Sequence, residues 1–306
     1  MNAKFSFTAV MMLTAGSALA DCDTVVMSDV GWTDITATTA ATSVVLEALG
    51  YDTEIKVLSV PVTYASMASG DVDVFLGNWM PTMEADIASY REAGTVDTVR
   101  ANLEGAKYTL AVNKVAADMG IADFADISGK AEALDGKIYG IEPGNDGNRL
   151  IQSMIDGDHF GLSAFEVVES SEQGMLAQVA RATRRDEPIV FLGWEPHPMN
   201  ANFEMSYLTG GDEFFGPNLG GATVYTNTAA GFASACPNLG AFLGNLVFSL
   251  AMENEIMAKI LDDGEDPQDA ATDWLTAHPD VVAAWLTGVT TKDGGDAAAA
   301  VAAALK

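Results

Sequence analysis

The sequence predicts an α/β protein of two lobes, with the chain crossing twice between them. Short β-rich runs alternate with helical patterns along the first two thirds of the 306 residues, which favours sheets with parallel strands. No low-complexity linker separates the segments. Two cysteines, Cys22 and Cys236, lie near the start and in the last third, and a bond between them would place both regions in one lobe. A ligand is then expected in the cleft between the lobes.

The expected elements follow in chain order. Strands are predicted at Thr24–Met27, Glu54–Leu58, Val72–Leu76, Tyr108–Val112, Lys137–Ile141 and Ile189–Leu192. Helices are predicted between them, at Ile35–Leu49, Thr63–Ser69, Thr82–Glu92, Arg149–Ile155 and Gln173–Arg184. A Gly-rich loop after about Gly210 leads to a candidate strand and then to a helical end, at Thr223–Asn227, Leu239–Lys259, Asp269–Thr276, Pro279–Leu286 and an alanine-rich tail.

The lobe boundaries follow from this order and from the cysteines. One lobe is expected to combine residues 21–112 with 213–306, and the other to span residues 113–212. In an oxidising compartment an even cysteine count favours a disulfide. A bridge closing so long a loop would stabilise the protein by roughly 5 kcal/mol in the chain-entropy model. Two buried free thiols are the alternative.

The first 20 residues have the pattern of a secretory signal peptide. Lys4 precedes an apolar run over residues 5–15, and an A-x-A sequence ends at Ala20, which predicts cleavage after Ala20. The run is shorter than the ~20 residues that a membrane span needs. Asp21 stands directly before Cys22, where a lipoprotein anchor needs a small residue. We therefore expect a soluble mature chain, exported to the periplasm and not inserted in the membrane.

Charge and missing motifs exclude several functions. Asp and Glu number 43 against 15 Lys and Arg, a net charge of −28. Such a chain is repelled by nucleic-acid phosphates and anionic lipid surfaces. The sequence has no G-x-S-x-G elbow, Walker A loop, H-E-x-x-H or C-x-x-C motif, and its three histidines have no i,i+4 partner among them. His197 stands between two prolines, where a loop role is favoured. We expect no catalysis, no metal and no cofactor.

Tryptophans follow predicted strands in three places. The segments F-L-G-N-W-M-P and F-L-G-W-E-P each contain a buried-type strand, a glycine, a tryptophan (Trp79 or Trp194) and a proline, and Trp32 follows the first strand. Ligands bind beyond the carboxyl ends of parallel strands, so each ring is expected at the mouth of a site. Tyr108 opens another strand near the first crossing. A single such tryptophan is more often core, but three at comparable positions favour a binding site.

The polar neighbours of these rings indicate the ligand's charge. A quaternary ammonium has no N–H to donate, and its best partner is a box of aromatic faces, each worth about 0.5–2 kcal/mol. Asp34 follows Trp32 by two residues. In the cleft it would favour a cation and oppose a second carboxylate by about 4 kcal/mol at ~4 Å with an effective dielectric near 20; a helix N-cap is its alternative role. Asn145 ends another strand, where its amide either caps a helix or binds a hydroxyl.

A family resemblance rests on these residues. The motifs V-G-W-T-D, L-G-N-W-M-P, K-Y, E-P-G-N and G-W-E-P-H, with the signal peptide, resemble the periplasmic substrate-binding proteins of ABC importers for quaternary amines, the glycine betaine/choline type, above all the choline-binding members of rhizobial-type importers. The resemblance covers essentially the whole mature chain and supports the Cys22–Cys236 bridge. It implies the two-lobed type II fold, with a box of four rings around the trimethylammonium and two residues at the hydroxyl end: Trp32, Trp79, Tyr108 and Trp194, then Asp34 and Asn145.

From this resemblance we expect the protein to capture choline by closure of the lobes. It would then deliver choline to a membrane permease that an ATPase drives. We expect the protein to be a monomer. Glycine betaine, proline betaine or carnitine are alternative ligands, although their carboxylates would face Asp34. A two-lobed periplasmic enzyme is a further alternative without a visible nucleophile, base or metal cluster. A secreted surface or metal-storage module would leave the repeated strand–Gly–Trp–Pro pattern unexplained.

Overall fold

The structure, a computed structural model, describes residues 22–306. The predicted signal peptide and its cleavage site lie outside the described residues. The strands are β1 (Thr24–Asp29), β2 (Asp52–Val57), β3 (Val74–Met80), β4 (Val96–Asn113), β5 (Lys137–Tyr139), β6 (Glu166–Val168), β7 (Val190–Glu195), β8 (Met205–Tyr207) and β9 (Gly221–Ala229).

Helices connect and cover these strands. In the first two thirds of the chain they are α1 (Thr33–Ala48), α2 (Val60–Ser69), α3 (Glu84–Glu92), α4 (Lys114–Asp118), α5 (Phe124–Ile127), η1 (Ser128–Lys130), α6 (Asp146–Asp156), η2 (His159–Gly161), α7 (Glu172–Arg184) and α8 (Met199–Asn202). They continue with α9 (Asp212–Phe215), α10 (Pro217–Gly220), α11 (Phe232–Ala235), α12 (Pro237–Asn245), α13 (Leu250–Ala258), η3 (Lys259–Asp263), α14 (Pro267–Ala277), α15 (Pro279–Trp285) and α16 (Ala297–Ala304).

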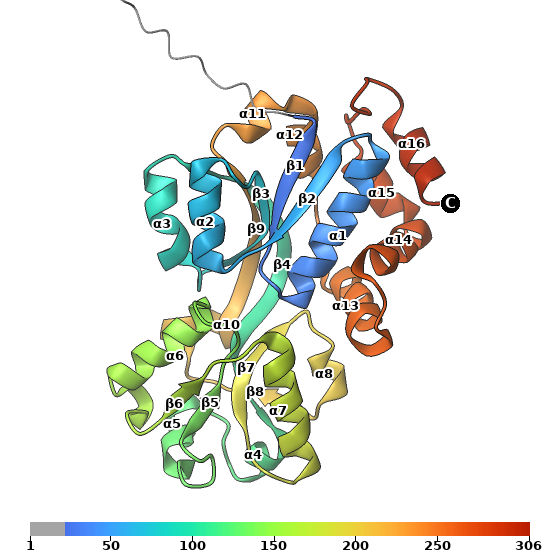
Figure 1. The fold of residues 1–306 in the computed structure, drawn as a ribbon. Helices are drawn as coiled ribbons and strands as arrows, with labels where there is room; N and C mark the ends of the chain where they lie inside the picture. The colour runs from blue at the N-terminus through green and yellow to red at the C-terminus, as the bar shows by residue number, and fades with distance from the viewer. Residues whose placement is uncertain (1–21) are drawn as a thin grey trace, which may run out of the picture.

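The molecule has two lobes that share one sheet (Figure 1). The first lobe holds β1–β3, α1–α3 and α11–α16, and the second holds β5–β8 and α4–α8. The strand order β2-β1-β3-β9-β4-β7-β5-β6, with β8 on β4, runs through both. The long strand β4 pairs with β9 from Val96 to Lys107 and with β7 from Lys107 to Val112. The chain thus leaves the first lobe along β4 and returns to it along β9. The exact residues at which the lobes are divided stay a prediction.

The expectation of parallel sheets is correct for the outer strands of each lobe and wrong for the strands at and beside the two crossings. β1 pairs in parallel with β2 and β3, and β5 with β6 and β7. The pairs β3–β9, β4–β9, β4–β7 and β4–β8 are antiparallel. Two crossings in opposite directions make neighbouring strands run in opposite directions at the junction. The mixed sheet is therefore a consequence of the chain leaving the first lobe and returning to it.

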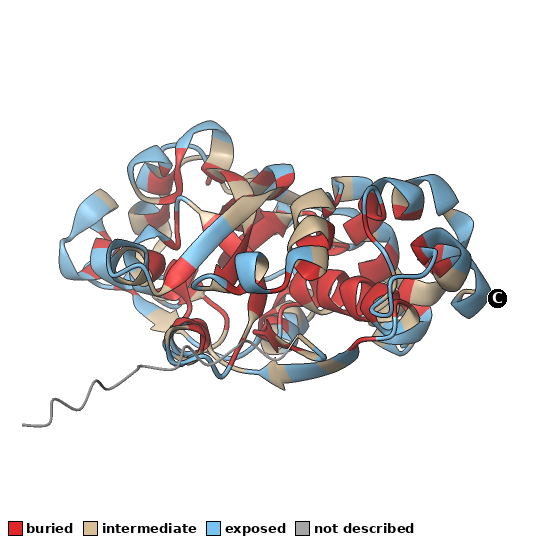
Figure 2. Cartoon of the chain, turned by 90° about the horizontal axis from the view of Figure 1, so that it is seen from above, coloured by how far each residue is buried: buried red, intermediate tan, exposed pale blue. Residues whose placement is uncertain are grey.

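Helix α1 is enclosed by the first lobe. Twelve of its sixteen residues are buried, and it packs against β1–β3 on one side and α13, α14 and α16 on another (Figures 1 and 2). A helix that is apolar or small all round belongs in an interior, and its alanines and threonines permit close approach. The hydroxyls of Thr38 and Thr42 donate to the carbonyls of Asp34 and Thr38 at 3.0 and 2.8 Å, so these buried threonines are satisfied.

The carboxyl-terminal third adds the disulfide and one correction. Cys22 and Cys236 form the predicted disulfide, which ties the beginning of β1 to the start of α12. The single helix predicted over Leu239–Lys259 is wrong, because the chain is extended at Leu246 and a new helix begins after Ser249. The Ser249 hydroxyl accepts from the Met252 amide at 3.2 Å, a standard N-cap. Within residues 22–306, no helix is long and apolar enough to cross a membrane.

Candidate ligand site

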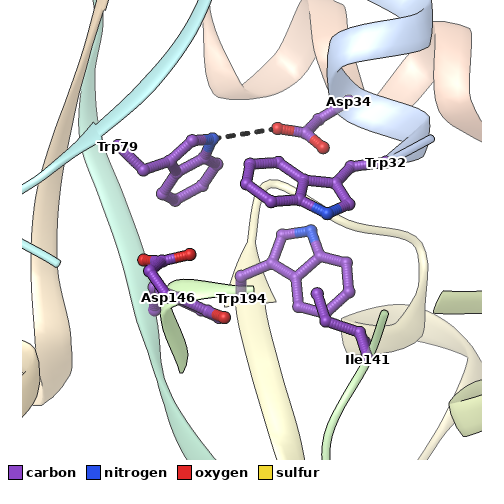
Figure 3. A pocket seen from close by; sticks show the side chains of 7 residues that line it. Trp32, Asp34, Trp79, Ile141, Asp146 and Trp194 are labelled. Carbon is purple, nitrogen blue, oxygen red and sulfur yellow. Dashed lines mark hydrogen bonds between the residues drawn. The ribbon is translucent and has the colours of Figure 1, made fainter. Parts of the chain in front are cut away.

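A small cavity lies between the two lobes. Ligand sites are common at such interfaces between domains. Its lining comes from the ends of strands and the beginnings of helices in both lobes (Figure 3). The lining residues are Trp32, Asp34, Trp79, Tyr108, Ile141, Asp146 and Trp194.

Four aromatic rings meet at this cavity, and they are the four named in the sequence analysis. Trp79 lies near the end of β3, Trp194 near the end of β7, Tyr108 within β4, and Trp32 at the N-cap of α1. Each is at most 6% exposed. The ring of Tyr108 makes edge-to-face contacts with Trp79 and Trp194, with centroids 6.1 and 6.3 Å apart. The structure therefore brings together four side chains that are far apart in the sequence.

Carboxylates hold the polar edges of two of these rings. The indole N–H of Trp32 donates to Glu142 Oε1 at 2.9 Å, and that of Trp79 donates to Asp34 Oδ2 at 3.2 Å (Figure 3). Trp32 belongs to the first lobe and Glu142 to the second, so the first of these bonds joins the lobes. Because the N–H groups are occupied, the ring orientations are fixed and the apolar faces remain to contact a ligand.

Asn145 is the N-cap of α6 and supports the ring of Tyr108. Its Oδ1 accepts from the Gly147 and Asn148 amides at 2.8 and 3.2 Å and from the Tyr108 hydroxyl at 2.8 Å. Its Nδ2 donates to Asp146 Oδ1 at 3.2 Å. Asn145 is not among the lining residues of the cavity, and its predicted contact with a ligand hydroxyl stays a prediction. In the structure its amide orients two residues that do line the cavity.

Asp34 lines the cavity and is not the helix N-cap. It is the second residue of α1, behind Trp32 at the N-cap position, so the capping alternative is wrong. Its Oδ1 is buried and has no hydrogen-bond partner within residues 22–306. Burial, and secondarily the nearby charge of Glu172, raises the pKa of Asp34 to about 8. A buried carboxyl oxygen without a partner is costly, and a ligand with a donor or a positive charge would relieve that cost.

Asp146 is a second carboxyl at the cavity, and it is not among the residues predicted from the sequence. It is the first residue of α6 and fully buried, and burial raises its pKa to about 6. Its Oδ2, like Asp34 Oδ1, has no partner within the described chain. In Figure 3 its carboxyl group lies beside the ring of Trp79. The only available signal was its position next to Asn145, at the end of a predicted strand; Ile141, also missed, ends the same strand.

The charges of the lining favour a cation. Two of the seven lining residues are acidic and none is basic. With an effective dielectric near 20, a carboxylate at ~4 Å attracts a cation by about 4 kcal/mol and repels an anion equally. Nowhere in residues 22–306 do three or more metal-binding side chains form a group that could hold a metal ion. The arrangement is thus suited to an organic cation with apolar substituents, which the rings can contact.

Comparison with known proteins supports this chemistry. The family OpuAC, the substrate-binding domain of ABC-type glycine betaine transport systems, matches residues 23–277. The chain belongs to this family. Its description is that of a transporter's binding domain and not of an enzyme, and substrate-binding proteins of ABC importers work outside the cytoplasm.

Solved structures in this class confirm the two-lobed fold. An ABC-transporter choline-binding protein in complex with choline is 67% identical and has a TM-score of 0.92, over 93% of this chain and 99% of that one. The same kind of protein in an unliganded semi-closed conformation, with the same identity and coverage, has a TM-score of 0.86.

A sequence relative also covers part of the chain. An uncharacterised protein, ORF1, of Chromohalobacter salexigens is 49% identical over 143 residues, which are 47% of this chain and 91% of that protein.

Proposed function

We propose that this chain is the choline-binding protein of an ABC importer. It captures choline in the periplasm, after removal of residues 1–20, and delivers it as a monomer to the membrane permease, whose ATPase drives uptake. The observation that carries the proposal is the cavity, where four buried rings and two carboxyls meet and no basic residue is part of the lining. The 67% identity to a choline-binding protein in complex with choline supports it.

In the proposed binding mode the aromatic rings contact the charged end of choline and the polar side chains bind its hydroxyl. The rings of Trp32, Trp79, Tyr108 and Trp194 surround the trimethylammonium, each contributing about 0.5–2 kcal/mol of cation–π attraction. The choline hydroxyl binds at Asp34 Oδ1, with Asn145 near that end. For a ligand of about seven heavy atoms, a ceiling near −1.5 kcal/mol per atom allows about −10 kcal/mol. Micromolar affinity needs about −8.2 kcal/mol, so these contacts suffice.

Closure of the lobes completes the proposed box. Trp32, Asp34 and Trp79 come from the first lobe, Trp194 comes from the second, and Tyr108 lies on β4, which joins them. A ligand that touches both halves stabilises the closed arrangement because only that arrangement offers every contact. We assign residues 21–112 and 213–306 to the first lobe and residues 113–212 to the second.

Glycine betaine is the competing ligand, because the family description names it. It carries the same trimethylammonium but ends in a carboxylate, which Asp34 and Asp146 repel when they are ionised. A titration of the mature protein with each ligand, by calorimetry and tryptophan fluorescence, tests the proposal. We expect saturable choline binding at micromolar or tighter affinity and much weaker glycine betaine binding. Tighter glycine betaine binding would contradict the proposed ligand, and binding of neither would contradict the box.

The affinity for choline is expected to rise with pH. Choline keeps its charge at every pH, whereas the free protein binds protons at Asp34 and Asp146, whose pKa values are raised to about 8 and about 6. A bound cation favours the ionised carboxylates, so choline must displace these protons at lower pH. We expect the affinity to increase about fivefold or more between pH 6 and pH 8, and to level off above the higher pKa.

Calorimetry in two buffers of different ionisation enthalpy checks this directly, because choline binding near pH 7 should release protons. The Asp34→Asn variant should lose the upper part of the pH dependence and keep the lower part. A wild-type affinity that is constant from pH 6 to pH 8 would show that neither carboxyl exchanges its proton for the ligand.

A further inference from the structure

A buried carboxylate of the second lobe binds the amino end of a helix of the first. Glu172 is the first residue of α7, and Thr33 is the first residue of α1. The two helices belong to different lobes (Figure 1). The Thr33 amide donates to Glu172 Oε2 at 2.8 Å, and the Thr33 hydroxyl donates to Glu172 Oε1 at 2.5 Å. Both residues are at most 3% exposed, so these bonds are shielded from water.

Glu172 supplies what α1 lacks. The N-cap residue of α1, Trp32, has no side-chain oxygen to accept from the first-turn amides, which are unpaired at every helix start. The aligned peptide dipoles also give this end a partial positive charge, which favours an anion. Glu172 therefore acts as the capping anion of a helix that belongs to the other lobe. Charge-assisted hydrogen bonds of this kind are the strong ones.

His197 forms a hydrogen bond with Glu172 and contacts a ring that lines the cavity. His197 Nδ1 accepts from the Met199 amide at 2.9 Å, so we assign the ring proton to Nε2, which donates to Glu172 Oε1 at 3.1 Å. The His197 ring makes an edge-to-face contact with Trp194, with centroids 4.9 Å apart. Glu172 is thus bonded to Thr33, which follows Trp32 in the sequence. It is also bonded to His197, whose ring contacts Trp194.

An ion pair between the lobes differs from these bonds in its exposure. Arg149 of α6 donates to both oxygens of Asp86 of α3, at 3.0 and 2.6 Å. The Arg149 side chain is 41% exposed and the Asp86 side chain is 7% exposed, so water screens this pair from the Arg149 side. The bonds between Thr33 and Glu172 join the two lobes, so they break when the lobes separate. Its contribution therefore falls on the closed state.

We propose that Glu172 is a positioning residue that locks the lobes over the bound ligand, by capping α1 from across the cleft. The proposal rests on the proposed choline-binding function and adds to it a determinant of release. If choline first meets the open protein and the lobes then close, a weaker closed state raises the dissociation rate and leaves the association rate almost unchanged.

The test follows choline binding and release by stopped-flow tryptophan fluorescence in wild type and Glu172→Gln. We expect dissociation at least tenfold faster in the variant and association within threefold of wild type. Glu169→Gln is the matched control, because it removes the same charge from the same lobe. The Glu169 Oε1 accepts from Asn148 of its own lobe, at 3.1 Å. Its dissociation rate should equal that of wild type.

Thr33 gives an independent test from the other side of the cleft. Thr33→Val removes the hydroxyl donor and should speed dissociation, whereas Thr33→Ser keeps the donor and should restore the wild-type rate. Urea unfolding without choline reports any purely structural role. Wild-type release rates in both Glu172→Gln and Thr33→Val, even with lowered stability, would overturn the proposal. Wild-type protein that does not bind choline at all would instead refute the function on which it rests.

Discussion

Replacing Trp194 by alanine is expected to weaken choline binding at least tenfold. The ring is 4% exposed, lines the cavity and contacts Tyr108 edge to face. The substitution removes one aromatic wall, worth about 0.5–2 kcal/mol of cation–π attraction, together with the apolar surface that covers the methyl groups. It also admits water beside the remaining rings. Calorimetric titration with choline measures the loss.

Two further variants make this result specific. Trp194→Phe keeps an aromatic face and should lose less affinity than the alanine variant. Trp274→Phe is the control for a tryptophan elsewhere, since Trp274 lies on α14, stacks on His278 at 3.8 Å and does not line the cavity. It should bind choline as wild type does. An unchanged titration for Trp194→Ala would remove this wall from the proposed box.

Replacing Asp34 by asparagine is expected to change which ligand the protein prefers. Asparagine has nearly the same shape and can still accept from the Trp79 indole N–H, as Asp34 Oδ2 does at 3.2 Å. It lacks the negative charge, whose attraction for a cation at ~4 Å is at most about 4 kcal/mol with an effective dielectric near 20. We expect choline affinity at about pH 8 to fall at least tenfold, while glycine betaine loses its repulsion and binds no worse.

The measured quantity is the ratio of the two affinities, which should fall at least tenfold in favour of glycine betaine. Asp118→Asn is the matched control, because Asp118 is exposed, pairs with Lys114 at 2.8 Å and is not part of the cavity lining. Its ratio should equal that of wild type. If Asp34→Asn leaves the ratio unchanged, the carboxyl of Asp34 does not select between the ligands, and Asp146 becomes the residue to test.

The features that the sequence predicts correctly are those with a local signal. A strand that ends in glycine and tryptophan determines both the position and the direction of Trp79 and Trp194, and a strand followed by a helix start does so for Trp32. Each signal lies within a few consecutive residues, so it can be recognised without knowing how the lobes meet. The disulfide is predictable for a similar reason, since only two cysteines are available to pair.

The features that were missed depend on how the two lobes meet. Asp146 has the ordinary appearance of an acidic residue in the first turn of a helix, and only the position of α6 against the first lobe brings it to the cavity. Glu172 looks the same at the start of α7, although it caps a helix of the other lobe. The early part of β4 was also missed, because charged residues and register shifts between Thr98 and Ala106 interrupt its alternation.

The burial of α1 has a consequence for how recognition begins. A helix enclosed by β1–β3, α13 and α14 is held by its own lobe, so the backbone that carries Asp34 keeps its place whether or not the lobes are apart. Trp79 is tethered to the same end by its bond to Asp34. Ordering a mobile side chain on binding costs about 0.5–1.5 kcal/mol, and here that entropy is already lost on folding. The first lobe is therefore a rigid surface that selects the ligand, and the second lobe then closes over the bound ligand.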